Sequence, residues 1–206
     1  MKVMLINGSP HARGCTYTAL REAADALERN GIETEFLHVG GAPVAGCIAC
    51  NRCRTTGRCF VEDKVNEVLD ALDGIDGFLV GSPVYYACAA GQLLAFLDRL
   101  FYAAGGRFDG KPAAAVVSCR RGGASAAFGQ INKFFSMNNM PIVTSQYWNQ
   151  VHGFTPEDVR KDEEGLQTMR TLGNNMAWLL KCIEAGRQAG IEKPEREPFR
   201  MTNFIR

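Results

Sequence analysis

Near its N-terminus the chain reads Val3-Met4-Leu5-Ile6-Asn7-Gly8-Ser9-Pro10-His11-Ala12-Arg13-Gly14-Cys15-Thr16-Tyr17-Thr18. The apolar run at its start, bounded by Asn7 and Gly8, is typical of a strand that is buried on both faces of a parallel sheet. The segment that follows has apolar residues at helical spacing, namely Leu20, Ala23, Ala24 and Leu27. We therefore expect a strand, a loop and a helix here, and the remaining elements extend this unit.

The loop between this strand and this helix has the composition of an anion site. The first N–H groups of a helix are unpaired, and the helix dipole favours negative charge there. The side chains that can contact a phosphate are Ser9, His11, Arg13, Thr16 and Thr18. The glycine spacing fits neither the dinucleotide fingerprint nor the triphosphate loop, so the loop suits a single terminal phosphate. The alternative is an ordinary turn in which Ser9 or Thr16 caps the helix.

The rest of the chain alternates between strand-like and helix-like segments. Further strands are expected at 32–39, 77–80, 113–118 and 141–144. Helices are expected from about residue 62, around the leucines at 93–100, over 124–137, and from 155 to the glycine at 190. Five strands alternating with helices indicate one doubly wound α/β domain over residues 1–190, with a cysteine-rich insertion at 46–60. The tail at 191–206 either crosses onto a second subunit or is a frayed terminus.

Three loops are expected at the same edge of this sheet, because open α/β sheets bind ligands beyond the C-terminal ends of their strands. The second loop, Pro83-Val84-Tyr85-Tyr86, offers two aromatic rings and a proline-stiffened backbone, which suit a flat ring system. The third loop contains Arg120-Arg121-Gly122-Gly123. Taken alone, the second loop favours a surface loop with two structural tyrosines, and an arginine pair in a loop is often solvated surface.

Composition narrows the function classes. The chain has 206 residues, 46% of them hydrophobic, and 23 basic against 22 acidic residues, which leaves a net charge of +1. This balance gives no electrostatic reason to expect a nucleic acid or a membrane surface as partner. No apolar run approaches the roughly 20 residues of a membrane span, and the chain starts as a strand instead of a signal peptide. We therefore expect a cytoplasmic protein.

The three loops together resemble those of the flavodoxin-like NADPH-dependent FMN reductases and their relatives, the iron–sulfur flavoproteins. The matching segments are Gly8-Ser9-Pro10 through Thr18, Gly81-Ser82-Pro83-Val84-Tyr85-Tyr86 with Gly91-Gln92-Leu93, Arg120-Arg121-Gly122-Gly123, and Thr202-Asn203-Phe204-Ile205-Arg206. The resemblance implies a three-layer flavodoxin-like fold with a five-stranded parallel sheet in the order 2-1-3-4-5. It also implies an FMN cofactor, electrons from NADH or NADPH, and a flavin, quinone or protein as acceptor.

The residues that this resemblance assigns to FMN are Ser9, His11, Arg13, Cys15, Thr16, Tyr17, Thr18, Pro83, Val84, Tyr85, Tyr86, Ser118, Arg120, Arg121, Gly122 and Gly123. Cys15 departs from the family pattern, in which relatives more often carry Asn. Hydride transfer to a flavin needs no protein acid or base, so no catalytic residue is assigned. Arg120 or Arg121 is expected either to stabilise the anionic reduced flavin or to hold the extra phosphate of the nicotinamide nucleotide.

Four of the eight cysteines, Cys47, Cys50, Cys53 and Cys59, fall within one short segment. In a reducing compartment such a group favours a metal, a cluster or redox chemistry over structural disulfides. The spacing is too tight for paired zinc knuckles and is ferredoxin-like, so it suits a [4Fe–4S] cluster. The same run resembles that of the iron–sulfur flavoproteins. Free thiols and a regulatory disulfide are the alternatives.

The leading interpretation is an NAD(P)H-dependent FMN oxidoreductase that acts as a homodimer or homotetramer on a small-molecule or redox-protein acceptor. One rival is an electron carrier that shuttles between FMN and an iron–sulfur cluster. A second rival is a flavin-less interaction or sensor module whose cysteines bind metal or become oxidised. Steady-state NAD(P)H oxidation separates the enzyme from the carrier, and a yellow colour excludes the sensor.

Overall fold

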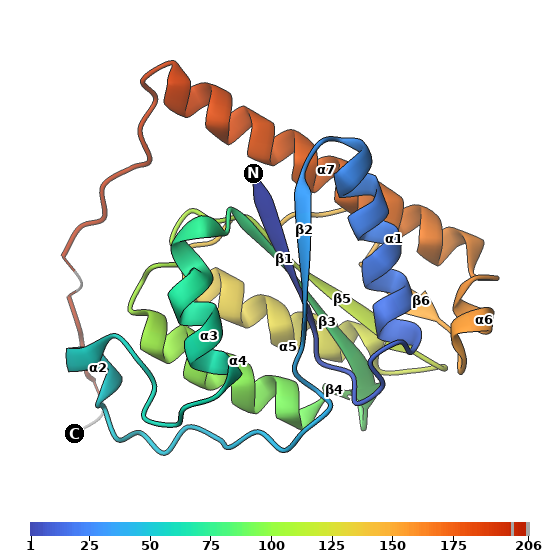
Figure 1. Cartoon of the computed structure of the whole chain (residues 1–206), viewed down its shortest axis with the longest axis horizontal. Helices are drawn as coiled ribbons and strands as arrows, with labels where there is room; N and C mark the ends of the chain where they lie inside the picture. The colour runs from blue at the N-terminus through green and yellow to red at the C-terminus, as the bar shows by residue number, and fades with distance from the viewer. Residues whose placement is uncertain (199, 205–206) are drawn as a thin grey trace.

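A computed structural model describes residues 1–198 and 200–204 as a twisted sheet between two layers of helices (Figure 1). The strands are β1 (Lys2–Asn7), β2 (Glu33–His38), β3 (Gly77–Tyr85), β4 (Cys88–Ala89), β5 (Ala113–Cys119) and β6 (Gln150–His152). The longer helices are α1 (Cys15–Arg29), α3 (Lys64–Ala71), α4 (Gly91–Ala104), α5 (Ala124–Met137) and α7 (Glu163–Gln188). Two short helices, α2 (Cys53–Thr56) and α6 (Pro156–Val159), and a 3-10 turn at Leu72–Gly74 complete the described part of the chain.

The sheet order confirms the flavodoxin-like expectation. The strands lie in the order β2-β1-β3-β5-β6, and the pairs along this path are parallel. If the small hairpin strand β4 is set aside, this is the predicted order 2-1-3-4-5. Strand β4 pairs antiparallel with the end of β3, so β3 runs further than the predicted 77–80.

The fifth strand was predicted at 141–144, and this was wrong. Ile142 makes only an isolated bridge to Ala113, and the strand that pairs with the end of β5 is β6. The chain leaves the sheet after Val143 and returns at Asn149, whose carbonyl accepts from the N–H of Val117 at 3.0 Å. The polar segment in between hydrogen-bonds to the outside of α7 instead, for example through Asn175 to the Thr144 carbonyl at 2.8 Å.

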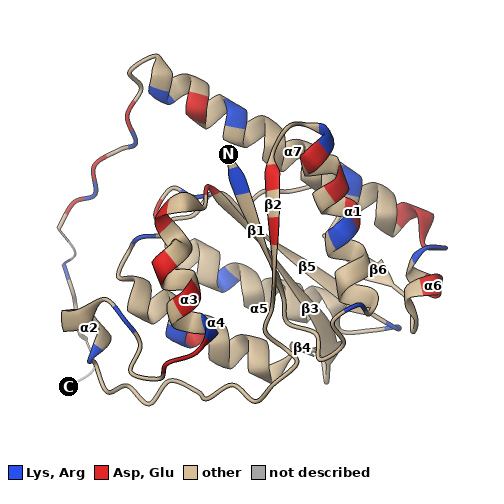
Figure 2. Ribbon diagram, viewed as in Figure 1, with Lys and Arg blue, Asp and Glu red and all other residues tan. Residues whose placement is uncertain are grey.

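Alternation of side chains along the strands builds two cores. Val3 and Leu5 of β1 pack with α1 and α7, whereas Met4 and Ile6 face α3, α4 and α5. Buried apolar area of this kind is the dominant favourable contribution to folding. Because both faces are covered, the strands contain continuous apolar runs, as the sequence of β5 shows. Figure 2 shows basic and acidic residues interspersed over the outer helices, in keeping with the near-zero net charge.

The tail leaves α7 as an extended segment along one side of the molecule (Figure 1). Its first part is held by Asp109, whose carboxylate lies 2.5 Å from the Lys193 amine and 3.0 Å from the Arg196 guanidinium. Met201 and Phe204 are exposed. The apolar tail residues Phe199 and Ile205, and the final Arg206, lie outside the described residues, and the crossing onto a second subunit stays a prediction.

Candidate functional site

The loops that follow β1, β3, β5 and β6 meet around one cavity of about 470 Å³ at the C-terminal edge of the sheet. Its lining residues are Ser9, His11, Cys15, Thr16, Pro83, Val84, Tyr85, Ser118, Cys119, Arg120, Gly153 and Phe154. Nine of these twelve belong to the predicted cofactor set, so the topology brings together three loops that are far apart in sequence. A cavity at this edge is where open α/β sheets bind ligands.

The first loop is shaped by Asn7, the last residue of β1. The Asn7 carboxamide oxygen accepts from the Ser9 N–H at 3.0 Å, and its NH₂ group donates to the Ala12 carbonyl at 3.1 Å. The Ser9 hydroxyl oxygen accepts from the His11 N–H at 3.2 Å. Because this hydroxyl receives a hydrogen bond there, its own O–H is left to donate toward the cavity.

The end of β2 supports this loop from behind. The His38 ring nitrogen Nε2 lies 2.8 Å from the Ser9 carbonyl oxygen. A Cβ atom at Gly40 would lie only 2.2 Å from the same oxygen, so glycine alone fits here. The loop is therefore fixed on both sides, by Asn7 from within and by His38 and Gly40 from the neighbouring strand. His38 therefore has a structural role in holding this loop.

Helix α1 begins at this loop without a side-chain cap, because Gly14 occupies the capping position. Neither Ser9 nor Thr16 caps it, so the N–H groups of the first turn have no side-chain cap. The Thr16 hydroxyl oxygen instead lies 2.8 Å from that of Ser118 at the end of β5. Both residues are buried and both line the cavity.

The second loop is a tight hairpin. Tyr85 pairs with Cys88, and the two residues between them, Tyr86 and Ala87, have φ angles of 50° and 60°. Two left-handed non-glycine residues in a row are strained. Tyr85 lines the cavity, whereas Tyr86 is fully exposed. Gly123 of the third loop lies directly against it, since a Cβ there would come within 2.7 Å of Ala87 Cα.

Seven predicted residues do not line the cavity, namely Arg13, Tyr17, Thr18, Tyr86, Arg121, Gly122 and Gly123. The Tyr17 ring packs against Phe36 with centroids 5.2 Å apart, and the Thr18 hydroxyl donates to the Gly14 carbonyl at 3.1 Å. Arg120 lines the cavity and Arg121 does not, so the structure separates the two arginines.

Cys119, Gly153 and Phe154 line the cavity and were missed by the sequence reasoning. Gly153 and Phe154 directly follow β6. Because the fifth strand was predicted at 141–144, the loop at the C-terminal end of this strand was expected at the wrong residues. Burial raises the pKa of Cys119 and also that of Cys15, whose thiol donates to the Gly153 carbonyl at 3.8 Å. Both thiols are therefore neutral near pH 7, and Arg120 brings a positive charge to the lining.

The cysteine-rich segment forms a second candidate site. Cys47, Cys50, Cys53 and Cys59 all line one small cavity of about 30 Å³, together with Arg99, Tyr102 and Phe60. All eight cysteines are free, so this structure contains no regulatory disulfide. Within residues 1–198 and 200–204, no three His, Cys, Asp or Glu side chains lie close enough together to hold a metal ion. The four thiols thus share a cavity without being arranged as ligands.

The backbone of this segment has an unusual shape between Cys47 and Cys53. Ala49 and Asn51 have φ angles of 53° and 57°, whereas the next residue, Arg52, is right-handed at −58°. Alternation of left-handed and right-handed residues turns successive N–H groups to one side, and such nests surround anions in phosphate and iron–sulfur sites. The segment therefore offers backbone donors beside its thiols.

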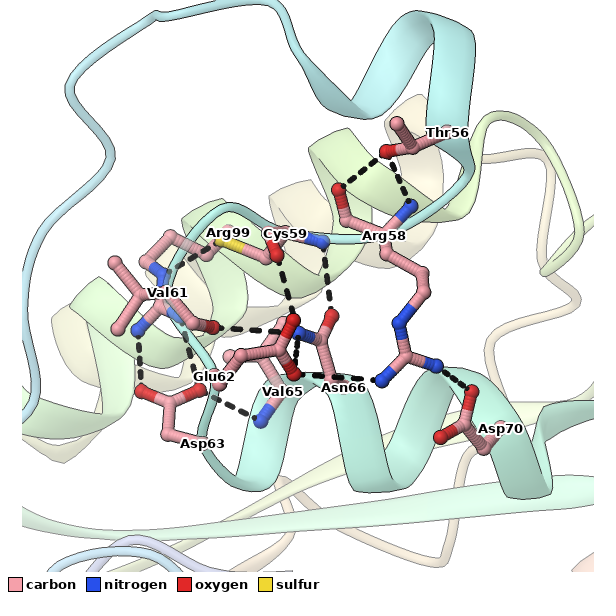
Figure 3. Close-up of polar contacts among 10 residues, drawn as sticks. All are labelled: Thr56, Arg58, Cys59, Val61, Glu62, Asp63, Val65, Asn66, Asp70 and Arg99. Carbon is pink, nitrogen blue, oxygen red and sulfur yellow. Dashed lines mark hydrogen bonds and ion pairs between the residues drawn. The ribbon is translucent and has the colours of Figure 1, made fainter.

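The segment is anchored by Arg99 of α4, a residue with only 2% of its surface exposed (Figure 3). Its guanidinium forms two parallel bonds with the Asp63 carboxylate, at 2.7 and 2.9 Å. Burial works against ionisation of Asp63, but the Arg99 bonds and the Val65 N–H outweigh it and lower the pKa of the carboxyl group. This buried cation was not identified from the sequence. The available signal was a charge on the apolar face of a leucine-rich helix.

Comparisons with known proteins agree on the family. The sequence pattern of the family described as NADPH-dependent FMN reductase matches residues 1–155. An iron–sulfur flavoprotein of Methanocaldococcus jannaschii is 36% identical over 194 residues, covering 89% of this chain and 100% of that protein. An iron–sulfur flavoprotein of Archaeoglobus fulgidus is 31% identical, covering 87% of this chain and 97% of the relative.

Solved structures agree on the fold. RosB, with the bound intermediate 8-demethyl-8-formylriboflavin-5'-phosphate, superposes with a TM-score of 0.69 at 15% identity, covering 99% of this chain and 92% of that one. The apo form of the NADH:FMN oxidoreductase EmoB gives a TM-score of 0.64 at 18% identity, covering 86% of this chain and 89% of that one. At such identities the likeness concerns architecture.

Proposed function

Since the chain belongs to the NADPH-dependent FMN reductase family and is a flavin oxidoreductase, we propose that it transfers electrons from NAD(P)H through bound FMN to a flavin, quinone or redox-protein acceptor. The observation that carries this proposal is the cavity at the C-terminal sheet edge. It combines an uncapped helix N-terminus, three inward hydroxyl-bearing residues, an aromatic hairpin and one arginine. An anion and a flat ring system therefore find matching groups in one place.

Different lining residues would contact different parts of FMN. Ser9, Thr16 and Ser118, with the N–H groups of the first turn of α1, would hold the terminal phosphate of FMN. The hairpin at Val84 and Tyr85 would border the ring system. When bound, FMN supplies the capacity to accept a hydride and to release electrons to a second acceptor. Arg120 would stabilise the negative charge that reduction brings to the ring.

The four clustered cysteines would hold a [4Fe–4S] cluster. Their chemistry fits, because iron–sulfur clusters are bound by cysteine thiolates, and here four free thiols line one cavity beside a backbone nest and a buried cation. Two of the similar proteins named above are iron–sulfur flavoproteins, and the sequence match spans nearly the full length of each. Since the thiols do not already lie at ligand positions, binding requires the segment 46–60 to close around the cluster.

A second candidate function is that of an electron carrier, which exchanges electrons between its flavin and its cluster without turnover of NAD(P)H on its own. The cysteine set favours it, since a simple reductase has no need of a one-electron centre. The two candidates differ in one measurement. An enzyme oxidises NAD(P)H steadily with a quinone or free flavin as acceptor, whereas a carrier needs its protein donor.

The experiment that tests the proposal begins with anaerobic purification and an absorbance spectrum. Extraction and chromatography of the bound flavin should give FMN and no FAD, because the first loop suits one terminal phosphate. Iron analysis should give about four irons per chain. A colourless protein that does not take up added FMN would refute the flavin site. Iron that stays absent after anaerobic reconstitution would refute the cluster alone.

A further inference from the structure

Among the described residues, Arg99 is the buried charged side chain that contacts the cysteine segment, and all of its donors have partners. The Arg99 NH groups donate to Asp63 at 2.7 and 2.9 Å, to the Val61 carbonyl at 3.1 Å and to the Ala45 carbonyl at 3.4 Å. The fifth donor, Nε–H, points to the Cys59 sulfur at 3.2 Å. A guanidinium has five N–H donors, so every one of them is used.

These contacts join the two ends of the cysteine segment. Ala45 precedes the first cysteine of the segment, whereas Val61 and Asp63 follow the last. Figure 3 shows Arg99 reaching from α4 to Cys59, Val61 and Asp63, which lie along one stretch of chain. Both ends of the segment are therefore fixed to one rigid helix, and the cysteines between them are confined to the space above it.

Cys59 is held in two independent ways. Asn66 of α3, itself buried, receives the Cys59 N–H at 2.8 Å and donates to the Cys59 carbonyl at 3.1 Å. Asn66 thus fixes the backbone of the cysteine and Arg99 contacts its sulfur. The two contacts can be removed one at a time, which makes their separate effects measurable.

We propose that Arg99 is the positioning residue of the cysteine segment, and that its bond to the Cys59 sulfur raises the reduction potential of the cluster that these cysteines hold. The second half of this statement rests on the proposed function. Hydrogen bonds to cysteine sulfur and nearby positive charge both stabilise the more negative, reduced form of a cluster. A guanidinium shielded from solvent exerts this effect more strongly than an exposed one.

The test compares Arg99→Lys, Arg99→Gln and Asn66→Ala with the wild-type holoprotein. Lysine keeps the charge but cannot reach four acceptors at once, and glutamine removes the charge. Asn66→Ala loosens the Cys59 backbone without touching the contact to sulfur. Arg107→Gln serves as control, because Arg107 also lies near α4 but makes an exposed ion pair with Asp73 at 2.9 Å.

The first readout is amide hydrogen exchange of residues 45–61 in iron-free, FMN-loaded protein. Arg99→Gln should speed exchange in this segment by about tenfold or more, the effect of losing a charged hydrogen bond. Arg107→Gln should leave it unchanged. Equal exchange in wild type and Arg99→Gln overturns the positioning role, whether or not any iron is ever bound.

The second readout is the cluster's reduction potential after anaerobic reconstitution. Arg99→Gln should shift it to lower values, Arg99→Lys less so, and Asn66→Ala should not shift it although it also speeds exchange. A potential that falls equally in Asn66→Ala and Arg99→Gln, or in neither, overturns the tuning role. If wild-type protein binds no iron, the proposed cluster fails and with it the tuning role, while the exchange result still decides positioning.

Discussion

The hydroxyl oxygens of Thr16 and Ser118 lie 2.8 Å apart, which joins the first turn of α1 to the end of β5 in the lining of the cavity at the C-terminal sheet edge. The two residues are separated by about half of the chain, yet the fold brings their hydroxyl groups into hydrogen-bond contact. In a pair of hydroxyls only one proton lies between the oxygens, so the second proton remains available to a phosphate.

Removing either member of this pair should therefore weaken FMN binding. Thr16→Val or Ser118→Ala loses a hydrogen bond to a charged ligand, worth about 1.5–3 kcal/mol, or roughly ten- to a hundredfold in the dissociation constant. Fluorescence titration of the apoprotein with FMN measures this dissociation constant. Thr18→Val is the matched control, because the Thr18 hydroxyl bonds to Gly14 and lies outside the cavity. Equal loss in Thr16→Val and Thr18→Val would assign the effect to α1 as a whole.

The two arginines of the third loop should behave differently. Arg120 lines the cavity, and its replacement by alanine should lower the reduction potential of FMN, because a positive charge near the ring favours the reduced anion. Arg121→Ala should change it little. Potentiometric titration of both variants measures this. A shift in Arg121→Ala alone would mean that the loop rearranges when the flavin binds.

The hairpin at Tyr86 and Ala87 stores backbone strain that glycine would relieve. Since Ala87 has a φ of 60°, Ala87→Gly should raise the free energy of unfolding by about 1 kcal/mol. Thermal unfolding of the apoprotein measures the gain. Cys88→Gly, outside the two-residue turn, should give no such gain. A destabilised Ala87→Gly variant would show that the methyl group packs against the third loop and that this contact outweighs the strain.

Acid should weaken the anchor of the cysteine segment. The pKa of Asp63 is lowered in the folded protein, so its contribution to stability is present above the ordinary carboxyl range and is lost as the pH falls below about 4. Asp63→Asn keeps the oxygen that caps α3 but loses the charge. Urea unfolding should show wild type to be the more stable at pH 7, with the difference shrinking as the pH falls below the ordinary carboxyl range. A difference independent of pH would place its origin elsewhere.

Cys50→Ala should abolish iron binding and leave FMN bound, because the two cavities share no lining residue. The variant should still reduce its flavin with a donor but fail to reduce a one-electron acceptor. Iron analysis, flavin content and stopped-flow reduction measure the three quantities. Cys182→Ala, an exposed cysteine on α7, is the control. Undiminished one-electron transfer by the Cys50→Ala variant would make the cysteines irrelevant to electron flow.

The sequence was sufficient for β1, β2, β3, β5, the longer helices and the three loops, because apolar periodicity and turn residues are local signals. Contacts between residues that are distant in the sequence could not be predicted from such local signals. Arg99 lies on the buried face of α4 and finds Asp63 only through the fold, and spacing along the chain does not show such a pair. Phe154 was missed because the edge strand is interrupted, and Val143 alone of the predicted strand is well buried.

Clamping both ends of the cysteine segment at one guanidinium has an evolutionary consequence. Since Ala45 and Val61 contact the same side chain, the chain enters and leaves the segment at nearly the same point in space. A lineage can therefore gain, lose or lengthen this segment in a single genetic event without disturbing the sheet, and loop-closure entropy changes only slowly with length. Segments of different length and composition can thus be exchanged on an otherwise constant sheet.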